Sequence, residues 1–432
     1  KQKTAYEIMP SLVGSEMCIR DSFWLARRAD IDITLTFFTT LAIFFFYVGY
    51  QQKKWRLYYY LIAYSAMALG FLTKLQPALI VPFFAIGVYF LWRKELKFFA
   101  DTAHLPGIAA FLVIISGWLY LAYSRGGGDY LFGLLFKKTA LTFFQTSGHL
   151  RSFHYYFLNF PADFLPWTLF FPSAIVYGLR QEKKEEAIFL LLWFSLIFLF
   201  FSFAKAKREL YILPIYPAAA LMVGKFWADL SSKEERPRLL SWPLFLLLAI
   251  LLITGVASPF MVMKFGHRYL SKPLEIGLVS AAILVGGSIF AFLGYQSNRK
   301  ALTFFVVVFM MFTIGLYGTF RIFPEINRYK SARPLSQSIV RIMKPGDQLG
   351  VYRLQGADFN YYTGCDRMKR FEQEEALKEF LRSSGRVFCV LRQRHYERLK
   401  MDPTLQIYEI KRGRVGHRRL VVISNTKGYD QD

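Results

Sequence analysis

Long apolar segments recur along this chain at short intervals, and they constrain its fold more than any other feature of the sequence. About ten such segments follow one another from position 32 onward, separated by short basic loops. A transmembrane helix needs about 20 mostly apolar residues, so the pattern predicts an α-helical polytopic membrane protein. The expected spans lie near 32–50, 57–73, 77–92, 105–123, 166–180, 185–203, 211–229, 239–257, 274–295 and 301–320.

The composition excludes several classes of protein. Hydrophobic residues make up 54% of the chain and charged residues 19%, below the roughly 25% charged residues of soluble domains. The net charge is +24. Because the basic residues lie between apolar segments, they favour a membrane surface or an anionic lipid as the partner, and not nucleic acid. Three Cys without metal-type spacing exclude a disulfide scaffold and a Cys-rich zinc site.

The first 22 residues differ from the rest of the chain, since they contain neither a helical period nor an apolar run. The stretch SLVGSEMCIRD resembles translated sequencing-adapter read-through, so we expect 1–22 to be an artefact and the chain to be an N-terminally truncated fragment. A polar N-terminal tail is the alternative. A transmembrane domain over 23–320 and a second domain over 321–432 are then expected.

Charge gives the predicted orientation. The loops that follow the odd-numbered spans are short and basic, and the positive-inside rule places them in the cytoplasm. The opposite loops are also basic, which an anionic ligand on the outer face would explain. The longest loop, 124–165, begins with a Gly triplet and an amphipathic stretch. Its pattern fits a helix in the membrane interface and equally a packing segment.

The composition becomes polar after Phe320, and strand and helix patterns alternate over 321–432. Such alternation predicts a small soluble α/β domain. It follows the last expected span and therefore lies on the outer, non-cytoplasmic face. Cys365 and Cys389 both fall in this domain, and the sequence leaves open whether they pair.

Two carboxylates lie at the outer mouth of the first span. Asp30 and Asp32 are candidate catalytic groups, because acidic residues at membrane depth are functional by default. A first-turn acid that stabilises the helix N-terminus is the alternative. Lys74 lies between two apolar runs, where it either binds a phosphate or extends its ammonium to the interface.

Three further basic residues and one histidine are candidate phosphate ligands. Lys207 and Arg208 precede a Pro-punctuated span, and a solvated basic loop is the alternative for them. His149 and Arg151 precede another span, beside tyrosines typical of an interfacial aromatic belt. The sequence contains no HExxH, P-loop or GxSxG motif, so no metal and no cofactor are expected.

Several segments, taken together and in order, resemble the bacterial polyprenyl-phosphate-sugar-dependent glycosyltransferases of the GT-C superfamily. The likeness extends to lipid A aminoarabinose transferases and to dolichyl-phosphate-mannose-protein mannosyltransferase-like proteins. The segments that carry it are ADIDITLTFF, GFLTKLQPALIVP, HLRSFHYYFLNFPADFLPWTLFFPSA, KAKRELYILPIYPAAALM, RYKSARPLSQSI and GRVFCVL.

The resemblance implies a GT-C-like bundle in the bacterial inner membrane, with its site facing the periplasm. It implies transfer of a sugar, with inversion, from a polyprenyl monophosphate to a lipid, glycan or protein acceptor. The family's motif positions fall on Asp32, Lys74, Lys207 and Arg208, while Leu75 stands where the family usually has glycine. The family's acidic first outer loop would precede this sequence, so this fragment is expected to be inactive.

Elementary chemistry agrees with that implication. The leaving group would be a phosphate, and cations that neutralise its developing charge lower the barrier without a metal. A carboxylate would deprotonate the acceptor hydroxyl, or orient the acceptor or a neighbouring cation. A non-catalytic lipid-carrier translocator or membrane assembly protein is the alternative, although we find none of the internal repeats typical of transporters.

Overall fold

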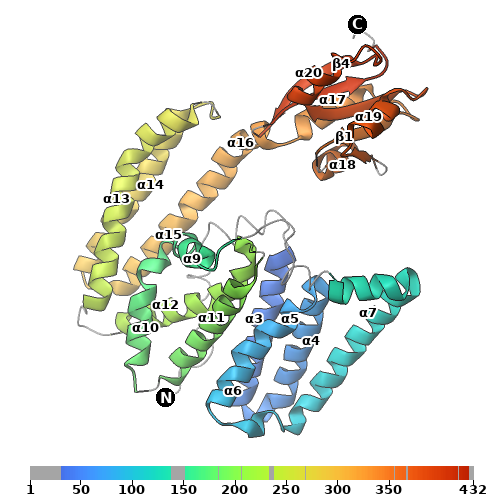
Figure 1. Ribbon diagram of the computed structural model, residues 1–432. Coiled ribbons are helices and arrows are strands. Elements are labelled where there is room, and N and C mark those ends of the chain that lie inside the picture. Colours follow the sequence, from blue (N-terminus) through green and yellow to red (C-terminus); the bar gives the residue numbers. More distant parts are fainter. Residues whose placement is uncertain are drawn as a thin grey trace. The chain divides into compact units, whose positions relative to one another are not determined.

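The computed structural model describes residues 31–137, 151–182, 184–205, 207–232, 238–267, 269–354, 356–365, 368–416 and 418–427. The expected artefact at 1–22 lies outside these residues. The chain forms two compact units: Lys1–Ser258 with Val279–Gly315, and Pro259–Leu278 with Leu316–Asp432. The first unit is helical, and the second contains the C-terminal sheet (Figure 1).

Within the described residues, seven helical segments are long and apolar enough to cross a membrane. They are Ile31–Gln51, Thr102–Phe136, Glu185–Phe203, Glu209–Ser231, Arg238–Gly266, Pro273–Gln296 and Lys300–Asn327. The shorter apolar helices Pro77–Trp92 and Trp167–Leu179, together with the helix Arg56–Lys74, occupy the other three expected ranges. The prediction of a polytopic helical membrane protein is therefore confirmed.

The first helices form a closely packed group. The elements are α3 (Ile31–Gln51), η2 (Lys53–Trp55), α4 (Arg56–Lys74), α5 (Pro77–Pro82), η3 (Phe83–Gly87), α6 (Val88–Trp92), η4 (Leu96–Phe98) and η5 (Thr102–His104). Helices α3 and α4 pack along each other and are joined by a short connection, so they run antiparallel. The start of α3 and the end of α4 therefore lie at the same end of the pair.

The segment that begins at 124 is helical, as the interfacial-helix alternative expected, but its helix continues the span that precedes it. Helix α7 (Leu105–Phe132) continues through the Gly triplet and is followed by the π-helical η6 (Gly133–Lys137). Gly127, with φ 75° and ψ 177°, breaks the helical conformation, and α7 bends sharply toward its C-terminal end in Figure 1. Glycine adopts this φ without a Cβ clash, so the chain bends and helical structure resumes.

The rest of the helical part follows the apolar pattern. Its elements are α9 (Tyr155–Asp163), η7 (Trp167–Leu169), α10 (Phe171–Leu179), α11 (Glu185–Phe203), η8 (Glu209–Ile215), α12 (Tyr216–Ser231), α13 (Arg238–Gly266), α14 (Pro273–Gln296), α15 (Lys300–Tyr317) and η9 (Gly318–Ile322). Large aromatic side chains fill much of the core, among them Tyr60, Phe90, Tyr156 and Trp167. Tyr60 meets Phe98, and Tyr156 meets Phe198, in edge-to-face contacts, which suit the aromatic quadrupole.

The C-terminal part folds as the predicted α/β domain. Its elements are α16 (Phe323–Lys330), α17 (Arg333–Ile342), β1 (Gln348–Tyr352), α18 (Ala357–Thr363), β2 (Lys369–Phe371), α19 (Glu374–Leu381), β3 (Val387–Arg392), α20 (Gln393–Leu399), β4 (Tyr408–Val415) and β5 (Arg418–Ser424). The sheet order is β2-β1-β3-β5-β4. Strand β1 pairs in parallel with β2 and β3, and β5 pairs antiparallel with β3 and β4.

Helices cover both faces of this sheet. One face packs on α19 and α20 through residues such as Leu377 and Leu399, and the other packs on α17 and α18 through Leu335 and Phe359. Cys365 and the buried Cys389 are both free cysteines. The elements α16, α18 and β2 were not anticipated from the sequence, because each is short.

Candidate functional site

The structure joins two of the predicted site residues in an ion pair. Asp32 lies in the first turn of α3 and Lys74 is the last residue of α4. The Lys74 ammonium donates a hydrogen bond to the Asp32 carboxylate. The Asp32 side chain is 9% exposed and that of Lys74 is 27% exposed. Each charge also suits the helix dipole at its own terminus, which favours this arrangement.

An aromatic ring forms a further contact with this ammonium. Lys74 Nζ lies 4.6 Å from the centroid of the Tyr211 ring. Tyr211 belongs to η8, which packs against α3. A ring face attracts a cation, so Lys74 is held between a carboxylate and a π-system while part of its side chain stays accessible.

Arg208 brings a second positive charge to this place. Its exposed side chain precedes η8, and its charge, like that of Asp32, acts on the Tyr211 hydroxyl. The Tyr156 hydroxyl donates a hydrogen bond of 2.8 Å to the Arg208 carbonyl. Because this bond fixes the backbone and not the guanidinium, the Arg208 side chain remains available to an anion.

Lys207 points to backbone carbonyls. It is 4% exposed, and its ammonium donates to the carbonyls of Ala204 and, at 3.1 Å, of Arg151. Burial lowers the pKa of this ammonium. The geometry gives Lys207 a positioning role in its loop, and the predicted contact with a phosphate stays a prediction.

Arg151 lies beside Lys207 in space. Its backbone N–H donates to the Lys205 carbonyl at 3.4 Å, and its exposed guanidinium lies 5.3 Å from the centroid of the Tyr155 ring. The predicted residues Asp30 and His149 lie outside the described part of the chain. Within the described part, no three His, Cys, Asp or Glu side chains gather in a way that would hold a metal ion.

Two features near Lys74 were not recognised in the sequence. Tyr211 follows Arg208 by one helical turn, and its N–H donates a hydrogen bond to the Arg208 carbonyl at 3.1 Å. This spacing was the signal in the sequence that could have placed Tyr211 beside Arg208. Gln76 donates to the Leu135 carbonyl of η6. The segment after the Gly127 bend therefore returns to the turn that carries Lys74.

The departure at Leu75 is resolved as a strained turn. Leu75 has φ 58° and ψ −123° at the end of α4, a conformation that glycine adopts far more readily than leucine. Its N–H still donates to the Phe71 carbonyl at 2.7 Å.

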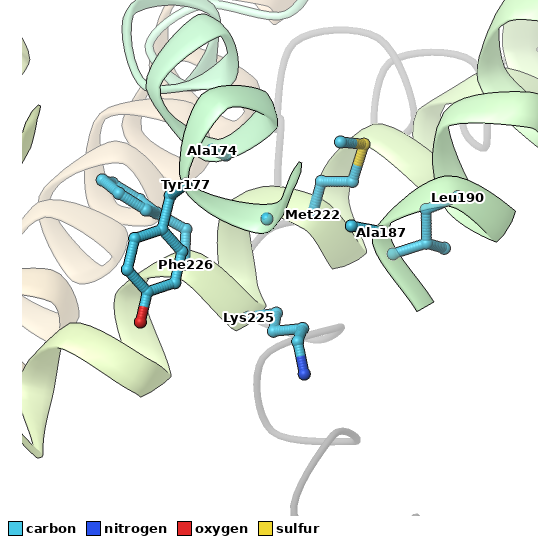
Figure 2. Close-up of a pocket in the computed structure, with 8 residues that line it drawn as sticks. Ala174, Tyr177, Ala187, Leu190, Met222, Lys225 and Phe226 are labelled. Carbon is cyan, nitrogen blue, oxygen red and sulfur yellow. The ribbon is translucent and has the colours of Figure 1, made fainter. Parts of the chain in front are cut away.

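A small pocket lies elsewhere, between α10, α11 and α12 (Figure 2). Its lining is apolar apart from Lys225 and the Tyr177 hydroxyl, and the Lys225 ammonium is paired with Glu186 at 2.7 Å. In Figure 2 the Lys225 ammonium and the Tyr177 hydroxyl both point away from the apolar residues. None of the predicted site residues lines this pocket.

Comparison with known proteins gives a family likeness. A family model described as dolichyl-phosphate-mannose-protein mannosyltransferase matches residues 21–121. An uncharacterised protein of Aquifex aeolicus is 31% identical over 216 residues, which cover 49% of this chain and 41% of that protein. An undecaprenyl phosphate-alpha-4-amino-4-deoxy-L-arabinose arabinosyl transferase of Aeromonas hydrophila is 26% identical over 303 residues, which cover 68% of this chain and 54% of that protein.

The chain spans about half, or less, of the length of the curated relatives it matches. Among solved structures, the fold is similar to that of ArnT from Cupriavidus metallidurans bound to undecaprenyl phosphate. The TM-score is 0.78 at 19% sequence identity, and the match covers 99% of this chain and 84% of that one. The predicted resemblance to GT-C glycosyltransferases of the lipid A aminoarabinose transferase type is therefore confirmed: the chain is similar to such proteins in sequence over part of its length, and to ArnT in fold.

Proposed function

We propose that this protein is an inverting glycosyltransferase. It would move a sugar from a polyprenyl-monophosphate donor to a lipid, glycan or protein acceptor. The observation that carries the proposal is the Lys74 ammonium, held between Asp32 and the Tyr211 ring with exposed Arg208 nearby. The family likeness supports the same chemistry.

The proposed reaction breaks the bond between the anomeric carbon and a phosphate oxygen. The acceptor oxygen attacks from the opposite face and loses its proton to a carboxylate. Negative charge then grows on the leaving phosphate, and the two cations Lys74 and Arg208 would stabilise it. Since the Asp32 carboxylate is bonded to Lys74, we assign Asp32 first to orienting that lysine, and the role of base to Asp30 or Asp32 stays a prediction.

The proposed place of reaction is the periplasmic face of the bacterial inner membrane, with the C-terminal domain on the same side. Basic loops after the odd-numbered spans support this orientation. Protease added to spheroplasts should remove the C-terminal domain, while inverted membrane vesicles should protect it. Cleavage in inverted vesicles alone would reverse the orientation and contradict the proposal.

Binding and transfer test the proposal directly. We expect Lys74→Ala and Arg208→Ala each to weaken binding of undecaprenyl phosphate by about 10- to 100-fold, the range for losing a hydrogen bond to a charged group. Transfer from radiolabelled polyprenyl-phosphate sugars, measured in membranes that contain the protein, should be abolished in both variants.

Lys225→Ala is the matched control, because it also removes an ion-paired lysine but leaves the Lys74 site intact. It should bind and transfer as the wild type does. Wild-type binding in both Lys74→Ala and Arg208→Ala would refute the phosphate role. Binding without transfer by the intact wild-type protein would favour a carrier translocator.

A further inference from the structure

Arginines that the proposed transfer reaction does not use lie at one end of the C-terminal sheet, where strands β1 and β3 end. Strands β1 and β3 are parallel, with Val351 opposite Val390, so the residues at their carboxyl ends lie side by side. Strand β5 runs the other way, with Leu420 opposite Arg392, and the β4–β5 turn therefore lies at this same edge. We call it the arginine edge, and its members are Arg353, Arg392, Arg394, Arg414, Arg418 and Arg419.

The positive charge at this edge is not neutralised by neighbouring carboxylates. Among the described residues, Arg392, Arg394, Arg418 and Arg419 form no ion pair. Glu372 pairs with Arg370, Glu409 with Arg412, and Glu374 with Lys378 and Arg398, while Glu397 accepts a hydrogen bond from Gln393. An excess of positive charge is left over for a ligand.

Two buried N–H-bearing groups at this edge also lack a partner. Arg392 Nε and His395 Nε2 are buried and make no hydrogen bond within the described part of the chain. Burial lowers the pKa of His395, and the charges of Arg394, Arg353 and Arg392 lower it further. The charges of these arginines thus act on one imidazole, and an anionic group drawn to their exposed side chains would offset that concentration of positive charge.

The second unit itself places this edge near the membrane surface. The turn between the apolar helices α13 and α14 must lie at that surface, because both helices are long enough to span. Ser271 in this turn donates from its N–H to Glu325 of α16 at 2.6 Å, and the Tyr269 ring lies edge-on to Tyr329 of α16. Tyrosine pairs of this kind are typical of the headgroup region.

Helix α16 connects that turn to the arginine edge. The Gly416 N–H, in the β4–β5 turn, donates to the Tyr329 carbonyl at 2.8 Å. Tyr329 itself comes just after the apolar segment that ends at Asn327. The β4–β5 turn, with Arg414, Arg418 and Arg419 around it, is therefore tied to the end of that apolar segment, where we expect the lipid headgroups.

We propose that the arginine edge binds the phosphate groups of anionic lipids at the membrane surface and so holds the C-terminal domain at headgroup level. Arginine suits this ligand because its planar guanidinium binds phosphate oxygens in pairs. The proposal does not rest on the glycosyltransferase reaction, since its readout is binding and requires no turnover.

The test uses the full chain in nanodiscs of phosphatidylcholine, with and without phosphatidylglycerol. Hydrogen exchange of the backbone amides over 412–420 should slow when the anionic lipid is present, and the effect should weaken with salt. Each arginine near an anionic surface should contribute about a fivefold change in the contact equilibrium. The double variant R418Q/R419Q, both members exposed, should lose most of the protection.

The matched control R341Q/K427Q removes the same charge from exposed positions at the opposite edge, in the last turn of α17 and after β5. It should keep the full protection by phosphatidylglycerol. Equal exchange rates in the two lipid compositions would overturn the proposal. Equal loss of protection in both double variants would overturn it too, because net charge alone would then explain the binding.

Discussion

The ion pair between Asp32 and Lys74 yields the sharpest prediction for stability. Lys74→Met removes the ammonium and leaves the carboxylate of Asp32, 9% exposed, without its cation. Removing one partner of a fully buried pair costs about 3–5 kcal/mol. The helix dipole at the start of α3 stabilises a first-turn acid by about 0.3–1 kcal/mol, which lowers this cost. The pair is also not fully buried, since Lys74 is 27% exposed. We therefore expect about 2–3 kcal/mol of destabilisation.

The double variant Asp32→Asn/Lys74→Met tests the physical reason. It leaves neither a buried charge nor an unpaired one, so it should recover at least about 1 kcal/mol relative to Lys74→Met alone. Free energies of unfolding can be measured by SDS titration in mixed micelles, followed by tryptophan fluorescence.

Lys225→Met is the control for this series. Lys225 and Glu186 are 41% and 46% exposed, and exposed pairs contribute only about 0–1 kcal/mol. Strict additivity of the Asp32→Asn and Lys74→Met effects would refute the coupling, as would a Lys74→Met protein as stable as the wild type.

Two further predictions concern backbone positions. Because Leu75 has a positive φ, Leu75→Gly should be more stable than Leu75→Ala by about 1–2 kcal/mol in the same SDS titration, and a more stable alanine variant would contradict the strain. In the sheet, a Cβ at Gly350 would meet Phe371 at 2.8 Å, while one at Gly385 would meet nothing within 4 Å. Gly350→Ala should therefore destabilise the C-terminal domain by about 1–3 kcal/mol, and Gly385→Ala should lack that steric cost. Limited proteolysis of the two variants distinguishes these outcomes, and equal protease resistance would contradict them.

Some of the site was predictable because motif and chemistry coincide. Asp32, Lys74 and Arg208 were chosen as rare charges next to apolar runs, and the structure brings their neighbourhoods together. Lys207 shows the limit of that reasoning. A lysine beside an arginine in a basic loop predicts a shared ligand, but only the folded loop shows that its ammonium is directed to two carbonyls.

The C-terminal domain shows the same division. Alternating strand and helix patterns predicted its class, and about ten apolar segments predicted the membrane part, in which seven described helices are long enough to span. The count of arginines over 321–432 did not predict the arginine edge, because the register of β1, β3 and β5 decides which of them meet.

Local sequence alone determined that this chain forms apolar helices and a small α/β domain. An apolar run and the alternating period of a strand can each be recognised within a single segment. Tertiary structure alone decided which residues far apart in the sequence come into contact. Asp32 and Lys74 stand far apart in the sequence and meet because α3 and α4 run antiparallel. The bend at Gly127 returns η6 to Gln76 for a similar reason, because a positive φ turns the helix back where the pattern indicated a loop.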